Sequence, residues 1–242
     1  MKEKTVSEAV AFRRSIRVYD PEKPIDSELV KECIKHASLA PTSSNLQLWE
    51  FYHITSETQK KEIAAACFNQ PAARTAQQMV IPVVRMDLWP QRVEANIEFI
   101  KSGFAKNKVT DPKTQERALY YYQKMIPHLY KGGTPIRGFL MKLYMTFRGL
   151  RKTTYREVNA SDLRIVGHKS TALASQNFMM SMAAKGYDTC PMEGFDSKKL
   201  KQILKLTAEA EISMVISCGI RKPEGIYGDR FRIPFEEVYF ER

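Results

Sequence analysis

A long, mostly apolar stretch from Ser161 to Lys185 constrains the fold of this chain more than any other feature. Its apolar pattern predicts one continuous helix, and Gly186 follows it as a helix C-cap does. Small side chains recur along it, and they let one helix pack closely against another, often that of a second copy. The small residues are Ala172, Ala174, Ser175, Ala183 and Ala184.

The segments around this helix mix helical and extended patterns without strict βαβ alternation. Residues Met79–Met86 form an apolar, β-branched run typical of a buried strand. Asp26 is placed as an N-cap for a helix over Ser27–Leu39, which Pro41 ends. Further helices are predicted at Ser7–Arg14, Glu57–Cys67, Arg92–Phe104, Thr114–Ile126, Phe139–Leu150 and Ser197–Leu206, and strands at Glu50–Thr55 and Glu211–Ile220. This mixture predicts an α+β layered domain.

A chain of 242 residues fits one domain, here 1–242, with a helical, basic insertion at about 88–160. Breaks at Asp111-Pro112 and at Gly132-Gly133-Thr134-Pro135 divide this insertion. Residues 88–164 hold fifteen Lys or Arg and six Asp or Glu, so they carry +9 of the net charge of +11. Such charge attracts phosphates, dinucleotides, nucleic acid or anionic lipid, and a solvated surface explains it equally well. Because no recognised nucleic-acid module accompanies the charge, we expect no nucleic-acid partner.

The cysteines and the apolar segments indicate a cytoplasmic protein. No two cysteines are close in sequence and no histidine stands at metal-ligand spacing, so we expect neither a metal site nor a disulfide framework. No apolar window is long enough for a membrane span, and Met1–Lys4 lead into a polar pattern rather than a signal peptide. The cysteines are Cys33, Cys67, Cys190 and Cys218.

Two basic segments, one near each end of the chain, are candidates for a phosphate site. Arg13, Ser15 and Arg17, with Arg14 between them, lie where a helix gives way to an extended segment. Guanidinium groups match phosphate oxygens bidentately, although basic residues are also common at helix ends, and this segment alone favours that explanation. Arg230 and Arg232 share one face of an extended segment because they are two residues apart.

Two further segments have the chemistry to contact a flat, heteroatom-rich ring. The first, Pro41-Thr42-Ser43-Ser44-Asn45 with Gln47 and Trp49 after it, is a polar loop whose amides and hydroxyls suit such a ring or a ribityl chain. A turn chosen for local backbone bonding explains it as well. In the second, Cys190-Pro191-Met192-Glu193-Gly194-Phe195, the proline fixes the chain and the glycine allows close approach of a ligand to the main chain. Here we favour a binding role, and we interpret Cys190 as a packing residue because no His or Lys stands nearby to lower its pKa.

The order and chemistry of these segments resemble the FMN-dependent nitroreductase family. The loop resembles the family's SPSSxNxQPW-like stretch, with Leu48 where proline is frequent, and residues 191–196 resemble its PxEGFD element. The family also carries a Lys/Arg pair where Arg230 and Arg232 stand, and Asn69 occupies the place of a family amide near the flavin. The resemblance covers residues 5–86 and 160–238 and leaves out the middle of the chain.

The resemblance implies a three-layer fold, with a mainly antiparallel sheet flanked by helices, in an intertwined homodimer that holds FMN at its interface. The loop at 41–45 would come from the second subunit, the long helix would form the dimer core, and the tail at 235–242 would wrap the partner. No catalytic side chain is assigned, because hydride arrives and leaves at flavin N5 near Glu193 and Gly194. The implied FMN-binding residues are Arg13, Arg14, Ser15, Arg17, Pro41, Thr42, Ser43, Asn45, Gln47, Asn69, Pro191, Met192, Glu193, Gly194, Arg230 and Arg232.

The implied activity is a ping-pong transfer of hydride from NADH or NADPH, through FMN, to a small oxidised acceptor such as a nitroaromatic or a quinone. An alternative keeps the flavin and changes the reaction to reductive dehalogenation or to ring oxidation or cleavage. Tyr120, Tyr121, Tyr122 and Lys124 are candidates for a lid in such an enzyme, but their helical spacing favours a packed face.

Residues 139–152 suggest a third possibility, a flavoprotein that contacts a membrane surface. Their mixture of apolar and basic side chains is typical of a helix that lies on an anionic membrane or in a partner's groove. Such patterns more often cover a core, and the sequence favours that explanation.

Overall fold

A five-stranded sheet forms the centre of the computed structural model, which describes residues 3–131 and 135–242. The strands lie in the order β1-β2-β5-β3, with β4 beside β2, and every ladder is antiparallel. Their bounds are β1 Trp49–Ile54, β2 Gln78–Val84, β3 Asp188–Met192, β4 Glu211–Ile212 and β5 Val215–Gly219. The predicted α+β class with a mainly antiparallel sheet is confirmed.

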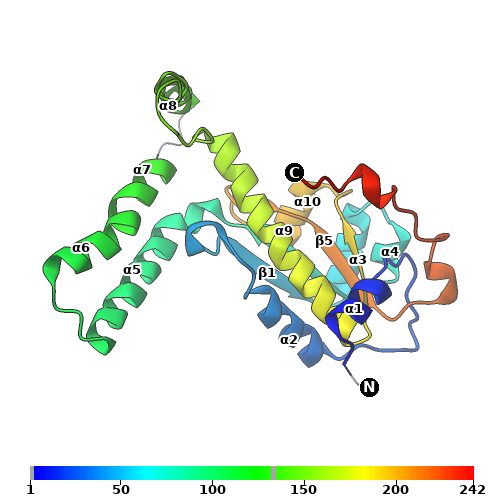
Figure 1. Cartoon of the computed structure of the whole chain (residues 1–242). Helices are drawn as coiled ribbons and strands as arrows, with labels where there is room; N and C mark the ends of the chain where they lie inside the picture. The colour runs from blue at the N-terminus through cyan, green and yellow to red at the C-terminus, as the bar shows by residue number, and fades with distance from the viewer. Residues whose placement is uncertain (1–2, 132–134) are drawn as a thin grey trace.

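Helices cover both faces of this sheet, and others project to one side (Figure 1). The α-helices are α1 Val6–Phe12, α2 Ser27–Ala37, α3 Glu57–Ala66, α4 Pro71–Arg74, α5 Trp89–Lys106, α6 Pro112–Tyr120, α7 Ile126–Tyr130, α8 Pro135–Arg148, α9 Ala160–Ala184 and α10 Ser197–Ile203. Short turns of helix are η1 Ser43–Asn45, η2 Met86–Leu88, η4 Pro223–Gly225 and η5 Phe235–Glu237, and η3 Tyr121–Met125 is π-helical.

Strand β2 lies at the centre because both of its faces are apolar, and all of its residues are buried. Met79, Ile81 and Val83 belong to the core cluster that includes residues of α3, α4 and α10. Val80, which points to the opposite face, packs in a second cluster with residues of α2 and α9. The predicted three layers are therefore present.

The predicted strand Glu211–Ile220 is divided into β4 and β5. Val83 pairs with Ile212, whereas Val80 pairs with Ile216. The segment between β4 and β5 therefore has one residue more than the part of β2 that it faces. Pro82 lies at this place in β2, accepting from the Ser213 amide at 2.9 Å and having no N–H to donate in return. The missing donor interrupts the ladder and leaves a bulge.

Helix α9 matches its prediction to within one residue at each end. Asp162 caps its start, since its carboxylate accepts from the Asn159 main-chain amide at 3.1 Å. Gly186 follows its end with φ +83°, a conformation that favours glycine. Asp26 caps α2 as predicted, since its carboxylate accepts from the Glu28 amide at 2.8 Å.

Helices α5 to α8 extend away from the sheet (Figure 1). A third apolar cluster joins α5, α6 and α7 to the chain before β1, through Val93, Ile97, Leu119, Ile126 and Leu46 among others. Of the predicted break at 132–135, residues 132–134 lie outside the described part of the chain. Within residues 3–131 and 135–242, every helix is too short or too polar to cross a bilayer.

Candidate functional site

The segment Arg13–Arg17 is held beside the edge strand of the sheet. The Ile16 amide donates to the Thr189 carbonyl in β3 at 3.2 Å, and the Arg17 amide donates to the Gly225 carbonyl at 2.8 Å. A side chain at Gly225 would collide with the Val18 carbonyl oxygen, so glycine permits this close approach. These contacts place the end of α1 against both β3 and the turn at 223–225.

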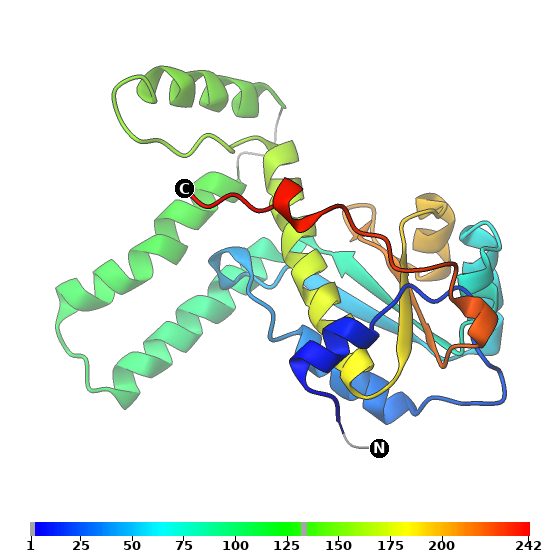
Figure 2. The ribbon, with the colours of Figure 1, turned by 45° about the vertical axis from the view of Figure 1, so that its right-hand side comes forward.

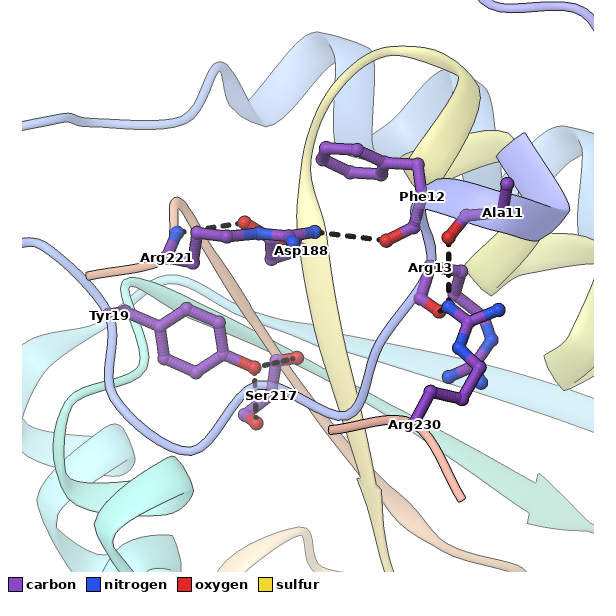
Figure 3. A network of polar contacts seen from close by, with 8 residues as sticks. All are labelled: Ala11, Phe12, Arg13, Tyr19, Asp188, Ser217, Arg221 and Arg230. Atoms are coloured by element: carbon purple, nitrogen blue, oxygen red, sulfur yellow. Dashed lines mark hydrogen bonds and ion pairs between the residues drawn. The ribbon is translucent and has the colours of Figure 1, made fainter. Parts of the chain in front are cut away.

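The C-terminal arginine segment is tied to the same place. The Arg230 guanidinium donates from Nη2 to the carbonyls of Ala11 at 2.8 Å and Arg13 at 2.7 Å, and so satisfies carbonyls at the end of α1 (Figure 3). Arg14 donates to the Gly228 carbonyl at 2.9 Å. Two segments more than two hundred residues apart in sequence therefore meet at one helix end.

This meeting concentrates positive charge. The pKa of Arg13 is lowered, first by burial and then by the charges of Arg230 and Arg232. The ion pairs formed by described residues use other arginines, namely Arg85, Arg164 and Arg221. In residues 3–131 and 135–242, none of the five predicted arginines has a carboxylate partner. A cluster of uncompensated guanidinium groups at a helix end fits a dianionic phosphate.

Cys190 borders the cluster without the properties of a nucleophile. Arg17 donates to its sulfur at 3.2 Å. Burial raises the pKa of this thiol, and the neighbouring charges of Arg17 and Arg13 offset that effect only in part.

We expect all four thiols to be unreactive in the folded protein. Each cysteine is buried, and burial raises the pKa of Cys33 to about 12 and that of Cys67 to about 11. A thiol reagent at pH 8 should modify less than one cysteine per native chain and all four after denaturation, because the thiolate is the reacting form. Rapid stoichiometric modification of the native protein would contradict this assignment.

An ion pair with a buried carboxylate, which the sequence analysis missed, fixes the geometry next to the cluster (Figure 3). Arg221 bonds Asp188 of β3 through its main-chain amide at 2.8 Å and through its guanidinium. The same guanidinium donates to the Phe12 carbonyl at 3.2 Å and lies 4.2 Å from the centre of the Phe12 ring. Asp188 thereby connects the start of β3 to the last residue of α1.

The segment 191–194 continues from the edge strand toward the surface. Pro191 lies in β3, where an edge strand tolerates a residue without an N–H. Met192 is buried, while Glu193 and Gly194 are exposed. Gln70 donates to the Gly194 carbonyl at 2.7 Å and to the Cys67 carbonyl at 3.0 Å. The bend after β3 is thus supported from the loop after α3.

The residue of that loop that reaches the bend is Gln70, one position after the predicted Asn69. Asn69 is exposed, with φ +52°. The sequence signal for this contact was a side-chain amide in the turn after a helix. Asn69 and Gln70 both carry such an amide, so the signal did not distinguish between them.

Gln70→Leu should lower the free energy of unfolding by about 0.5–1.5 kcal/mol, because it removes a neutral hydrogen bond to the Gly194 carbonyl. Urea unfolding followed by circular dichroism measures the change. An unchanged free energy of unfolding would mean that the Gly194 bend does not depend on this support.

The loop Pro41–Gln47 lies elsewhere in the same chain. Its Ser43 amide donates to Ser170 of α9 at 3.4 Å, whereas Lys4, just before α1, donates to Ala184 of that helix at 3.0 Å. Fourteen residues of helix separate these contacts, which is about 21 Å at 1.5 Å per residue. Figures 1 and 2 both place η1 well away from α1. One chain therefore does not bring the two halves of the predicted site together.

Helices of the insertion hold this loop in an unusual conformation. Ser44, Asn45 and Gln47 all have positive φ, which polar contacts with α5 and η3 stabilise. The side-chain amide of Asn45 donates to the side-chain oxygen of Asn96 at 2.9 Å. The side-chain amide of Asn96 donates in turn to the main-chain carbonyl of Asn45 at 3.1 Å.

Two tyrosines proposed above for a packed face contact the same loop. The Tyr121 and Ser44 hydroxyls lie 2.7 Å apart, and the Tyr122 hydroxyl donates to the Ser44 carbonyl at 3.0 Å. Both tyrosines belong to the π-helical segment η3, and such segments are frequent at functional sites. The insertion thus contributes side chains next to a predicted binding loop.

Comparison with known proteins gives a consistent result. A family model described as the Nitroreductase family matches residues 10–220. Protein DrgA of Synechocystis is 25% identical over 88% of this chain and 83% of its own length. YdgI of Bacillus subtilis, provisionally named an NAD(P)H nitroreductase, is 27% identical over 96% and 94%. The structure of a provisionally assigned nitroreductase from Exiguobacterium sibiricum in complex with FMN has a TM-score of 0.69, with 22% identity over 100% of this chain and 99% of that one.

Proposed function

The chain belongs to the nitroreductase family, and on that premise we propose that it is an FMN-dependent oxidoreductase using NADH or NADPH to reduce a small oxidised acceptor. Relatives that align over most of the chain carry NAD(P)H nitroreductase in their names, and a protein of the same fold binds FMN. Nitroaromatics and quinones are the acceptor classes we favour, with the nicotinamide leaving before the acceptor binds.

The observation that carries this proposal is the arginine cluster at the end of α1. Arg14 and Arg230 donate to main-chain carbonyls and so hold the two segments together. Arg13, Arg17 and Arg232 complete the proposed FMN phosphate site, and the exposed Ser15 adds a hydroxyl donor. Arg17 also donates to the Cys190 sulfur and Arg232 to the Phe231 carbonyl.

The main chain at Glu193 and Gly194 is proposed to face the flavin ring, since Gln70 and β3 hold this bend rigid. Bound FMN supplies the two-electron hydride chemistry, which side chains of this protein do not provide. The protein orients the ring, excludes water and holds positive charge near the cofactor. We assign no side chain a proton-transfer role.

A second copy is proposed to supply the loop at 41–47. In one chain this loop contacts α9 at Ser170, whereas the chain just before α1 contacts α9 at Ala184. The two contacts are about 21 Å apart along the helix. Ile165 and Leu173 on α9 are half exposed, and several apolar residues of the C-terminal tail are at least half exposed; a homodimer would cover them. The tail residues are Phe231, Ile233, Phe235, Val238, Tyr239 and Phe240.

The division into one domain with an insertion at about 88–160 stays a prediction, as does a cytoplasmic location. Helices α5 to α8 and the separate apolar cluster within them support the division. Four cysteines without a disulfide support a reducing compartment.

Absorption spectroscopy of the purified protein, followed by steady-state kinetics, tests this function. We expect flavin bands and parallel double-reciprocal lines when NADPH is varied against a quinone or a nitroaromatic. Testing halophenols alongside separates this reaction from reductive dehalogenation. A colourless protein that does not take up added FMN would contradict the proposal.

A further inference from the structure

The insertion carries an extreme charge asymmetry around α8. The forty residues from Arg117 to Arg156 contain nine Lys or Arg and no Asp or Glu. The basic residues are Arg117, Lys124, Lys131, Arg137, Lys142, Arg148, Arg151, Lys152 and Arg156. An exposed surface built from this segment attracts anions and repels a second copy of the same surface.

Helix α8 has two opposite apolar faces. Gly138, Met141 and Met145 line a pocket, so this face points toward the rest of the protein. The opposite face is exposed although it is large and apolar, with Phe139 at 67% and Phe147 at 64% exposure. It also includes Ile136, Leu140, Leu143 and Tyr144.

This outward face needs an occupant that is apolar inside and anionic at its surface. At 100° per residue, the exposed apolar side chains form one continuous stripe, with Lys142 on one flank and Arg148 on the other. Lys and Arg flanking a stripe that contains aromatic residues is the pattern of a helix lying in a membrane interface. In Figure 1, α8 is the topmost element, beyond the end of α7 and the start of α9.

We propose that α8 docks on an anionic lipid bilayer, with its outward face in the interface and its basic flanks at the headgroups. A bilayer accounts for the apolar stripe and the positive charge together. A second copy of this chain accounts only for the apolar stripe, because Lys142 and Arg148 on one copy would lie against the same basic flanks on the other.

The pocket under α8 then identifies the acceptor class, an inference that rests on the proposed function. The pocket has a volume of about 360 Å³ and is lined mainly by apolar side chains, among them Met125, Leu129 and Met141. Ser43 and Ser44 of the proposed flavin-contacting loop also line it. A pocket roofed by a membrane-lying helix suits a lipophilic quinone taken from the bilayer.

Sedimentation with lipid vesicles tests the docking. The full-length protein should bind vesicles of phosphatidylglycerol and phosphatidylcholine, bind pure phosphatidylcholine much more weakly, and lose binding as salt increases. The double variant F139E/F147E should bind at least about tenfold more weakly, because two apolar side chains no longer enter the interface. F99E is a control for an added surface carboxylate, since Phe99 is also exposed but lies on α5, and it should bind as the unchanged protein does.

Three results would overturn the docking proposal. In the first, the unchanged protein does not bind anionic vesicles, and in the second, F139E/F147E binds them as tightly as the unchanged protein does. In the third, size-exclusion chromatography shows a dimer of the unchanged protein and a monomer of F139E/F147E. The last result would identify a second copy as the occupant.

A comparison of two quinones tests the acceptor class. F139E/F147E should reduce a water-soluble quinone at the unchanged rate and a long-chain quinone held in anionic vesicles at least about tenfold more slowly. Equal rates with both quinones would reject the acceptor inference. Absence of turnover with either quinone in the unchanged protein would reject the proposed function while leaving vesicle binding to stand by itself.

Discussion

Arg13→Gln should weaken FMN binding by about 10- to 150-fold, because a hydrogen bond to a charged group contributes about 1.5–3 kcal/mol. Arg13 is the arginine whose pKa is lowered by burial and by its positive neighbours, so a bound phosphate would relieve that repulsion. The ligand-free variant should unfold at the same or a higher temperature, since one of the repelling charges is gone. Flavin fluorescence titration and thermal melts measure the two effects.

Arg117→Gln is the matched control for this prediction, because Arg117 lies on α6 in the projecting helices. It removes the same charge from the chain and should leave FMN affinity unchanged. If the two variants lose affinity equally, net charge rather than a local phosphate site governs binding. If Arg13→Gln keeps full affinity, the cluster does not hold the phosphate.

Asp188→Ala should destabilise the fold by about 1.5–3 kcal/mol, because it removes the charge-assisted hydrogen bonds between a buried carboxylate and Arg221. Asp188 is 3% exposed and bonds both the main chain and the guanidinium of Arg221. Because Arg221 also contacts Phe12, the residue before Arg13, FMN affinity should fall as well. Urea unfolding followed by circular dichroism gives the free energy of unfolding.

Glu28→Ala provides the comparison for this ion pair. Glu28 pairs with Lys31 at 3.4 Å, and both side chains are more than half exposed, so its loss should cost no more than about 1 kcal/mol. A loss for Asp188→Ala as small as that for Glu28→Ala would show that the Asp188–Arg221 pair does not hold α1 to the sheet.

The elements that the sequence predicted well are those with a strong local pattern. Strand β2 is an apolar run buried along its whole length, and helix α9 is a long segment with a capping residue before it and Gly186 after it. Strand β3 was missed because it is short and contains Pro191, which reads as a turn residue. The bulge between β4 and β5 depends on Pro82 in another strand, and a local pattern does not contain that information.

The site shows the same difference between local and distant information. The family resemblance indicated that Arg13 and Arg230 act together, but their contact, across 217 residues, comes from the fold. Asp188 and Arg221 carry no motif and lie 33 residues apart, so nothing local indicated their pairing. Whether the predicted residues bind FMN stays a prediction.

Parallel titration of the protein with FMN and with riboflavin tests the central claim most directly, because the two ligands differ only in the phosphate. We predict that riboflavin binds at least about 100-fold more weakly, since it forms none of the charge-assisted hydrogen bonds with the arginine cluster. Equal affinity for the two ligands would contradict a phosphate site built from Arg13, Arg17 and Arg232.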